Sequence, residues 1–229
     1  MVKVGPLCVD KYEASVWSAF DGTGTQYGAA SDNYPGTFPD TGNWTAPVYA
    51  VSEAGVTPSR YITWFQAQQA CALSGKRLLT NAEWQMAAAG TPDPGTDNGT
   101  TDCAVDTAST PNVVNTGSRS SCVSKWSVND MVGNVPEWVA DWIQGPNGNG
   151  VEGAWDPGSF VSSAPYIASA AYGNDFIVGI NEASSTTDPF PAALIRGGGY
   201  YSGTGAGVFA LLATGDPTGS GNLGFRCAR

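Results

Sequence analysis

The sequence predicts a loop-rich α+β fold, with two helices, several short strands and a single domain over residues 1–229. Glycine (30 residues) and proline (15 residues) make up roughly a fifth of the chain, above the usual share of about 12%. The 8 Trp, 9 Tyr and 8 Phe residues supply a packed core, so this composition does not indicate disorder. Two helix-capping patterns interrupt the loops, and no linker divides two hydrophobic sets, which favours one domain.

The first element that we expect is an opening strand within residues 6–18. There Cys8, Asp10 and Tyr12 would share one face of the strand. Residues 20–60 are rich in Gly, Pro, Thr, Asn and Asp, and they predict a long surface excursion with little regular structure.

Two helices follow. Thr63 is a candidate N-cap, apolar residues recur at helical spacing from Trp64 to Cys71, and Gly75 suits the position just after the helix. In the second helix, Thr80 and Glu83 form the spacing of a capping box, in which each side chain binds the other residue's backbone N–H. Trp84 lies on its apolar face, and Gly90 ends it.

The remaining chain predicts a core segment and short strands. Residues 91–122 are polar and turn-rich, whereas residues 126–143 carry large apolar side chains that mark the core. The C-terminal stretch predicts strands over 194–196, 207–213 and 223–228, separated by Gly-rich loops.

The composition excludes several function classes. The chain has no histidine, which rules out a Ser-His-Asp triad, a Cys-His pair and His-ligated metals. The net charge of −10 repels phosphates, so we expect no nucleic-acid partner. No run of 18 apolar residues occurs, so we expect no transmembrane segment, and no signal peptide is visible.

The five cysteines leave two states open. Two disulfides and one free thiol would indicate an oxidising compartment and favour a secreted or cell-surface protein; five buried thiols would indicate a reducing one. A link between Cys103 and Cys122 would close a loop of about 20 residues and contribute roughly 3 kcal/mol on the entropic model.

Four segments, taken in order, resemble the formylglycine-generating enzyme (sulfatase-modifying factor) family: GKRLLTNAEWQMAAAG (75–90), DMVGNVPEWVADW (130–142), IRGGGYYSG (195–203) and LGFRCAR (223–229). The resemblance implies a C-type lectin-like fold. It also implies a disulfide between Cys71, in the first helix, and Cys227; Cys103 would then pair with Cys122 and leave Cys8 free. Arg77, Arg196 and Arg226 lie within these segments, and we expect them to be buried in pairs with Asp or Glu.

The sequence departs from the enzyme pattern where the redox cysteines should lie. No cysteine occurs between Arg196 and Arg226, so the thiolate that would hold copper and activate oxygen is missing. The iron-dependent sulfoxide synthases that share this domain need histidines, which the chain lacks. We therefore expect no catalytic residues, with a sulfatase-modifying oxidoreductase, or a degenerate relative of one, as the alternative.

The C-terminal stretch RGGGYYSGTGAGVFALLATGDPTGSGNLGFRCAR resembles the variable region of diversity-generating retroelement variable proteins, within about 196–227. In that family, adenines in the template are mutated, so that Asn codons become other residues on a fixed lectin-type scaffold. The resemblance implies ten exchangeable, ligand-binding positions: Tyr200, Tyr201, Ser202, Gly205, Leu212, Thr214, Gly215, Gly219, Gly221 and Asn222.

The composition of this stretch is compatible with such mutation. Adenine changes in an Asn codon cannot produce Lys, Glu, Gln, Met or Trp, and residues 197–223 contain none of these. A Gly-rich loop also avoids long side chains, so the observation does not exclude an ordinary loop.

The expected function is therefore non-enzymatic binding of varied macromolecules, such as a protein on a cell or phage surface. Tyrosines offer large contacts at low entropic cost, as in antibody paratopes, although both could instead pack beside Trp138. The variable positions should be more exposed than Val208, Phe209, Leu211 and Phe225, which should pack with Trp84, Trp138 and Trp142.

A calcium site is also implied by the resemblance to the enzyme family. Asp130 and Glu137 would provide side-chain oxygens, and Gly133 and Val135 would provide carbonyls, which suit Ca²⁺. Here Pro136 replaces a Trp of the family pattern. The alternative is a surface turn in which Glu137 binds backbone amides. No other cofactor is expected, and a calcium-dependent carbohydrate-binding module is a second alternative function.

Overall fold

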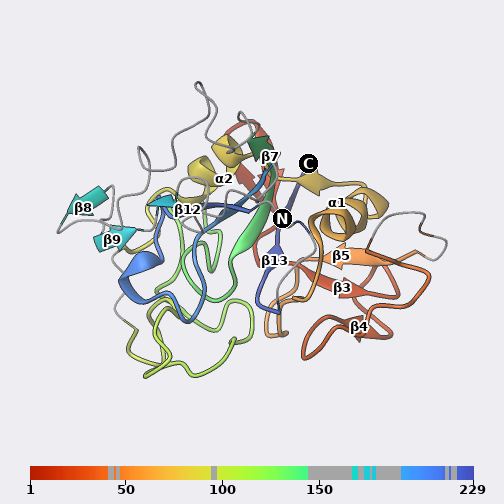
Figure 1. The fold of residues 1–229 in the computed structure, drawn as a ribbon, viewed down its shortest axis with the longest axis horizontal. Coiled ribbons are helices and arrows are strands. Elements are labelled where there is room, and N and C mark those ends of the chain that lie inside the picture. Colours follow the sequence, from red (N-terminus) through yellow and green to blue (C-terminus); the bar gives the residue numbers. More distant parts are fainter. Residues whose placement is uncertain are drawn as a thin grey trace, which may run out of the picture.

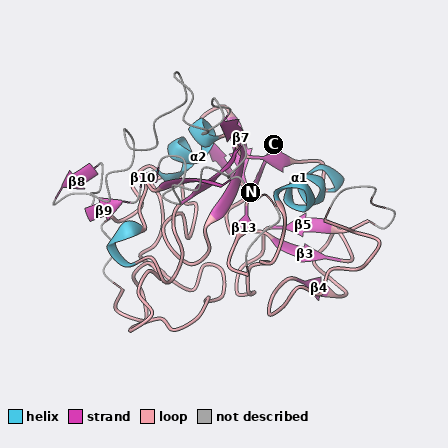
Figure 2. Ribbon diagram, viewed as in Figure 1, coloured by secondary structure: helices cyan, strands magenta, loops and turns pink. Residues whose placement is uncertain are grey.

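The computed structural model describes residues 1–40, 44, 47–93, 97–143, 167–169, 173–175, 177–178, 192–214, 217 and 221–229. Over these residues the chain forms the predicted α+β arrangement, in which two helices and small sheets are joined by long loops (Figures 1 and 2). None of the helices in these ranges is both long and apolar enough to cross a lipid bilayer.

The two ends of the chain meet in one small sheet. Its strand order is β1 (Val2–Val4), β2 (Leu7–Val9), β14 (Cys227–Ala228) and β6 (Arg77–Leu78). Cys8 and Arg229 exchange two backbone hydrogen bonds, and Figure 1 marks both termini near the middle of the molecule.

The prediction of one strand within residues 6–18 is wrong. The chain forms β2, leaves the sheet at Asp10, and begins β3 (Ser15–Trp17) in a different sheet. Asp10 is buried and pairs with Lys76, whereas Cys8 is exposed, so the expected shared face does not exist.

The predicted surface excursion over 20–60 is more ordered than expected. It contributes β4 (Gln26–Tyr27) and β5 (Tyr49–Val51), which pair antiparallel with the two edges of β3. Phe38 lies within it and is buried, so part of the segment belongs to the core.

The sheet with the most strands among the described residues has five strands. Its strand order is β10 (Ile177–Val178), β12 (Leu211–Thr214), β11 (Ala192–Arg196), β7 (Glu137–Ile143) and β13 (Gly224–Phe225). β11 runs antiparallel to both β7 and β12, and β8 (Ile167–Ser169) pairs with β9 (Gly173–Asp175) apart from this sheet.

The C-terminal strands differ in part from the prediction. The strand expected over 207–213 begins only at Leu211, because residues 207–210 form a turn in which the Ala210 N–H donates to Gly207. The strand expected over 223–228 is split into β13 and β14, which belong to different sheets.

Both predicted helices are confirmed. Helix α1 (Trp64–Leu73) begins after Thr63 with a capping box formed with Gln66, and α2 (Asn81–Ala88) begins after Thr80 with the expected box formed with Glu83. Gly75 and Gly90, which follow the helices, have φ values of +67° and +84°, the left-handed conformation that glycine adopts without strain.

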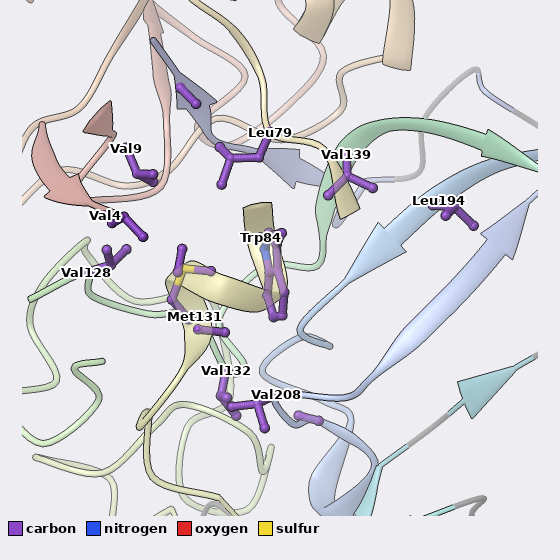
Figure 3. Close-up of a cluster of buried hydrophobic side chains, with 14 of the residues drawn as sticks. Val4, Val9, Leu79, Trp84, Val128, Met131, Val132, Val139, Leu194 and Val208 are labelled. Carbon is purple, nitrogen blue, oxygen red and sulfur yellow. The ribbon is translucent and has the colours of Figure 1, made fainter. Parts of the chain in front are cut away.

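The core consists of two clusters on opposite faces of β7. Trp138 belongs to the cluster with Ala67, Ala70 and Cys71 of α1, whereas the neighbouring Val139 belongs to the cluster with α2. Successive residues of a strand point to opposite faces, so β7 separates the two helices. Trp84 lies at the centre of the second cluster (Figure 3).

Both disulfide pairs implied by the resemblance are present. Cys71 of α1 is bonded to Cys227 of β14, a separation of 156 residues, and Cys103 is bonded to Cys122. Cys8 is free and exposed. The first bond ties the C-terminal strand to a helix in the core, and the second closes the polar segment between residues 91 and 122.

Candidate functional site

The loop between β11 and β12 is held against the core by backbone contacts. Gly197 and Gly198, which directly follow β11, have φ values of +84° and +76° and turn the chain away from the sheet. The Tyr200 N–H then donates to the Asn134 carbonyl at 2.9 Å, and the Gly203 N–H donates to Val105 at 2.6 Å. A short 3₁₀ turn, η1 (Gly203–Gly205), completes this loop.

A pocket of about 300 Å³ lies between this loop and the sheet. Ile195 and Arg196 of β11 and Leu211 and Leu212 of β12 line it, together with Pro136 and parts of the 198–210 loop. Most of these groups are apolar. The described lining comes from two parts of the chain that are far apart in the sequence, Pro136 and the continuous stretch from Ile195 to Leu212.

Two large apolar residues at this pocket are exposed to solvent. Tyr201 is 47% exposed and Leu212 is 39% exposed, and the Tyr201 ring makes an edge-to-face contact with Tyr200 at 5.2 Å between centroids. Burial raises the pKa of Tyr201, and Tyr200 adds to that effect. Burying either side chain would be favourable, so its exposure marks a surface available for contact.

The structure brings together some of the ten residues expected at the variable face. Tyr201, Ser202, Gly205 and Leu212 line the pocket, and Tyr200 lies beside Tyr201. Of these, Gly205 is the last residue of η1 and is buried, which departs from the expectation that all variable positions are exposed. Thr214 ends β12.

Other expected positions lie elsewhere. Gly221 lies against the Tyr61 ring, where an added Cβ would approach Cε1 to 2.8 Å, and Asn222 is half-buried. Neither is among the described residues that line the pocket. Gly215 and Gly219 fall outside the residues that the structure describes.

The scaffold residues of this segment are less exposed, as expected. Val208 is buried in the cluster of Trp84, and Phe225 is buried in the cluster of Trp138 and Trp142. Phe209 and Leu211 are only partly buried against the Trp84 cluster. The alternative that both tyrosines pack beside Trp138 is wrong for Tyr201, since half of its surface faces solvent.

The floor of the pocket is held by Arg196. Its guanidinium lies over the Trp84 ring, with Cζ 4.5 Å from the ring centroid, and Nη2 donates to the Val208 carbonyl and to Gln85. Among the described contacts, this arginine meets an amide, a carbonyl and an aromatic face, and its expected pairing with an acid stays a prediction.

Below this floor lies a buried ion pair. Arg226 donates through Nε and Nη2 to Glu137, with an Nη2–Oε1 distance of 2.8 Å, and Trp84 Nε1 donates to Glu137 at 2.7 Å. The pKa of Arg226 is raised: burial opposes its charge, but Glu137 more than offsets that. The expected burial of Arg226 with an acid is confirmed, whereas Arg77 is largely exposed and pairs with Glu83.

Two further carboxyls surround this pair. Glu13 accepts hydrogen bonds from Asn134 Nδ2 and the Val135 N–H, and Asp130 accepts from the Gly117 N–H. Burial raises the pKa of Glu13 well above its usual value, with Asp130 and Glu137 adding to the effect. Burial likewise raises the pKa of Asp130 to about 6. Both shifts favour the protonated form of these carboxyls.

The expected calcium ligands fit this arrangement poorly. The Glu137 carboxylate already accepts bonds from Arg226 and Trp84, so a calcium ion there would compete with a guanidinium. Calcium binding by Asp130, Gly133, Val135 and Glu137 stays a prediction. The alternative of a surface turn is wrong, because Glu137 is only 1% exposed.

Several of these groups were not found by sequence reasoning. Glu13 gave no local signal, and it meets Asn134 and Val135 more than 120 residues later in the chain. Pro136 was noted only as a departure from a family pattern, yet it lines the pocket.

Comparisons with known proteins agree with this description. The model of the "Sulfatase-modifying factor enzyme 1-like domain" family matches residues 2–229. A search of curated proteins by sequence found no match.

Solved structures share the fold. The I1 variant of Major Tropism Determinant is 21% identical with a TM-score of 0.53, and the M1 variant is 21% identical with a TM-score of 0.52. The aligned region covers 97% and 98% of this chain but only 50% of those chains, so this chain spans half of their length. PvdO from Pseudomonas aeruginosa is 18% identical with a TM-score of 0.51, over 97% of this chain and 80% of that one. The expected C-type lectin-like, α+β fold is thereby confirmed.

Proposed function

The chain belongs to the sulfatase-modifying factor enzyme 1-like domain family, and from this premise we propose that it is a non-enzymatic binding protein whose C-terminal face is diversified by a retroelement. The observation that carries the proposal is the exposure of Tyr201 and Leu212 beside one pocket. Both positions are exchangeable in the variable-protein pattern, and the exposure of these two side chains does not stabilise the fold.

The scaffold around these positions supports exchange of their side chains. The loop is held by backbone hydrogen bonds at Tyr200 and Gly203, which do not depend on side-chain identity. Surface substitutions usually change stability by less than about 0.5 kcal/mol, so many sequences could occupy the same frame. Solved structures with this fold include several that are titled as variants of one Major Tropism Determinant protein.

The target that we propose is a protein or another macromolecule on a cell or phage surface. The net charge of −10 disfavours nucleic acid, because phosphates would be repelled. Two disulfides are typical of oxidising compartments, and we place the domain at the cell surface or outside the cell.

Sequencing tests the diversification. The segment encoding residues 196–227 is sequenced from many sibling isolates, together with its genomic neighbourhood. We expect a second copy of the 3′ coding segment with adenines at the variable codons, and sibling differences confined to those codons. A single copy with uniform siblings would contradict the proposal.

The enzymatic alternative has its own test. No cysteine lies between Arg196 and Arg226, and Cys227 is bonded to Cys71, so no thiol is placed beside the pocket by the described residues. A Cys-containing sulfatase peptide should stay unoxidised with or without added copper. Copper-dependent turnover above a control without protein would establish the oxidoreductase instead.

A further inference from the structure

Building on the proposed function, the geometry points to a specific occupant of the pocket: one aromatic side chain, presented by a protein partner on a segment without net negative charge. The pocket has a defined shape, a volume of about 300 Å³ and described walls from β11, β12, Pro136 and the 198–210 loop. The family resemblance names the variable positions but not the kind of chemical group that they bind. The residues that form these walls indicate that group.

The size of the pocket suits one ring. An apolar protein cavity of about 150 Å³ is large enough to hold benzene. A pocket of about 300 Å³ therefore accommodates a phenyl, phenol or indole group together with its methylene. It is too small for a folded element of a partner, which would have to contact the rim instead.

The lining favours an apolar group over a polar one. Ser202 Oγ accepts the Gly199 N–H at 3.0 Å, and Arg196 Nη2 already donates to Val208 and Gln85. A sugar in the pocket would lose water at many hydroxyls, whereas among the described lining residues only Arg196, Tyr201 and Ser202 have polar side chains to replace it, which is costly. Ile195, Leu211 and Leu212 instead offer carbon surface.

The rim favours an aromatic group over an aliphatic one. The Tyr201 ring lies close to Pro136, since a Cβ added at Gly199 would lie 2.9 Å from Tyr201 Cε1 and 3.0 Å from Pro136 Cδ. Tyr201 already meets Tyr200 edge-to-face, and an entering ring would extend this arrangement. Aromatic rings gain from such offset or edge contacts beyond their buried area.

Charge selects the kind of molecule that carries the ring. Nucleotide bases also have aromatic faces, but their phosphates would approach a chain of net charge −10. A protein segment with Lys or Arg beside an aromatic residue is attracted by the same field. We therefore assign the pocket to an aromatic anchor with neutral or basic flanks.

The test uses three small neutral probes and one anionic nucleotide with the full chain. Saturation-transfer NMR and titration compare N-acetyl-phenylalaninamide with N-acetyl-leucinamide, methyl glucoside and AMP. We expect the aromatic amide to bind with a Kd in the millimolar range and at least about 5-fold more tightly than the others. Absence of binding, or tighter binding of the glucoside or AMP, would overturn the proposal.

Two variants locate the binding. Leu212→Asp places a charge at the pocket and should weaken the aromatic amide by about 10-fold or more. Phe20→Asp is the matched control, since Phe20 is the most exposed of the large apolar residues described (77%) and lies on the β3–β4 connection. Leu212→Ser replaces the first variant if that one does not fold. Unchanged binding by the Leu212 variant would overturn the proposal.

Flanking charge is tested with two peptides, acetyl-Lys-Phe-Lys-amide and acetyl-Glu-Phe-Glu-amide. The basic peptide should bind more tightly, and its advantage should shrink as salt is added. A preference for the acidic peptide would refute the charge argument. If sibling sequences vary but no aromatic probe binds, the proposed function stands and the aromatic anchor is rejected. If sibling sequences are uniform but the aromatic probe binds, the aromatic anchor stands and diversification is rejected.

Discussion

At the scale of single residues, Arg226 is held by hydrogen bonds from all three nitrogens of its guanidinium group. It donates to Glu137 through Nε and Nη2, to the Asp10 carbonyl through Nη1 and to the Asn129 carbonyl through Nη2. Arg226→Lys keeps the charge but cannot make these bonds together, since an ammonium lacks the planar fork. We expect a loss of about 3 kcal/mol in the free energy of unfolding, measured by urea denaturation.

The matched control for this variant is Arg77→Lys. The Arg77 side chain is 45% exposed, and its pair with Glu83 lies in solvent, so the change should stay within about 0.5 kcal/mol. Equal urea midpoints for the two variants would show that the buried network contributes little.

The carboxyl of Asp130 should make stability depend on pH. Its pKa of about 6 in the folded chain lies above the usual value near 3.9, so the folded state retains a proton that the unfolded state releases. Its contribution is therefore fully present below about pH 4 and is lost as the pH rises through about 6. The raised pKa of Glu13 acts in the same direction.

Asp130→Asn isolates this contribution. Asn tolerates the left-handed φ of +59° at this position, and its amide oxygen can accept the Gly117 N–H. The fall in unfolding free energy between pH 4.5 and 7.5 should be smaller in the variant by on the order of 1–3 kcal/mol. Parallel stability curves for the variant and the natural chain would show that this carboxyl does not carry the dependence.

At the scale of elements, the helices are held at their first turns. Thr80 Oγ1 accepts the Glu83 N–H at 3.2 Å, and Glu83 Oε2 accepts the Thr80 N–H at 2.9 Å. Thr80→Ala should lower the free energy of unfolding by about 1 kcal/mol, and Thr80→Ser should restore most of it. Thermal melts of the three proteins decide this, and an alanine variant as stable as the natural chain would contradict it.

These elements also show which parts of a fold a sequence can predict. The sequence predicts α1 and α2 almost to their ends, because an N-cap, a capping box and a glycine after a helix are signals between residues close in the sequence. The strands were harder to predict, because their ends depend on distant partners. The Asp10 N–H still donates to Cys227 of the first sheet, whereas the Ala14 N–H donates to Phe225 of the five-stranded sheet, so the chain passes from one sheet to the other between these two residues.

At the scale of the whole molecule, the candidate site depends on contacts that no local pattern contains. The exchangeable positions at Tyr201 and Leu212 could be named from a family resemblance, and their exposure follows that expectation. The pocket between them could not be predicted, since Pro136 and Ile195 reach it from separate strands and loops. The cluster around Glu137 was missed for the same reason, because Glu13 and Arg226 come from opposite ends of the chain.

The exchangeable positions should contribute little to the stability of the domain, whereas buried core residues such as Phe225 should contribute much. Replacing Tyr201, Leu212 and Asn222 together with Ser should cost no more than about 1.5 kcal/mol, because each surface change usually costs less than about 0.5 kcal/mol. For a domain of this size that cost lowers the Tm by roughly 3–6 °C. Phe225→Ser, at a fully buried position, should cost about 3–5 kcal/mol and lower the Tm by more than twice as much.

Differential scanning calorimetry of the two variants measures this contrast. The frame tolerates the triple change because Val208 and Phe225, not the exposed side chains, fill the two core clusters. A triple variant that melts as early as Phe225→Ser would mean that the face is part of the core. Exchange of its residues would then unfold the domain, and a diversified binding surface could not exist at this place.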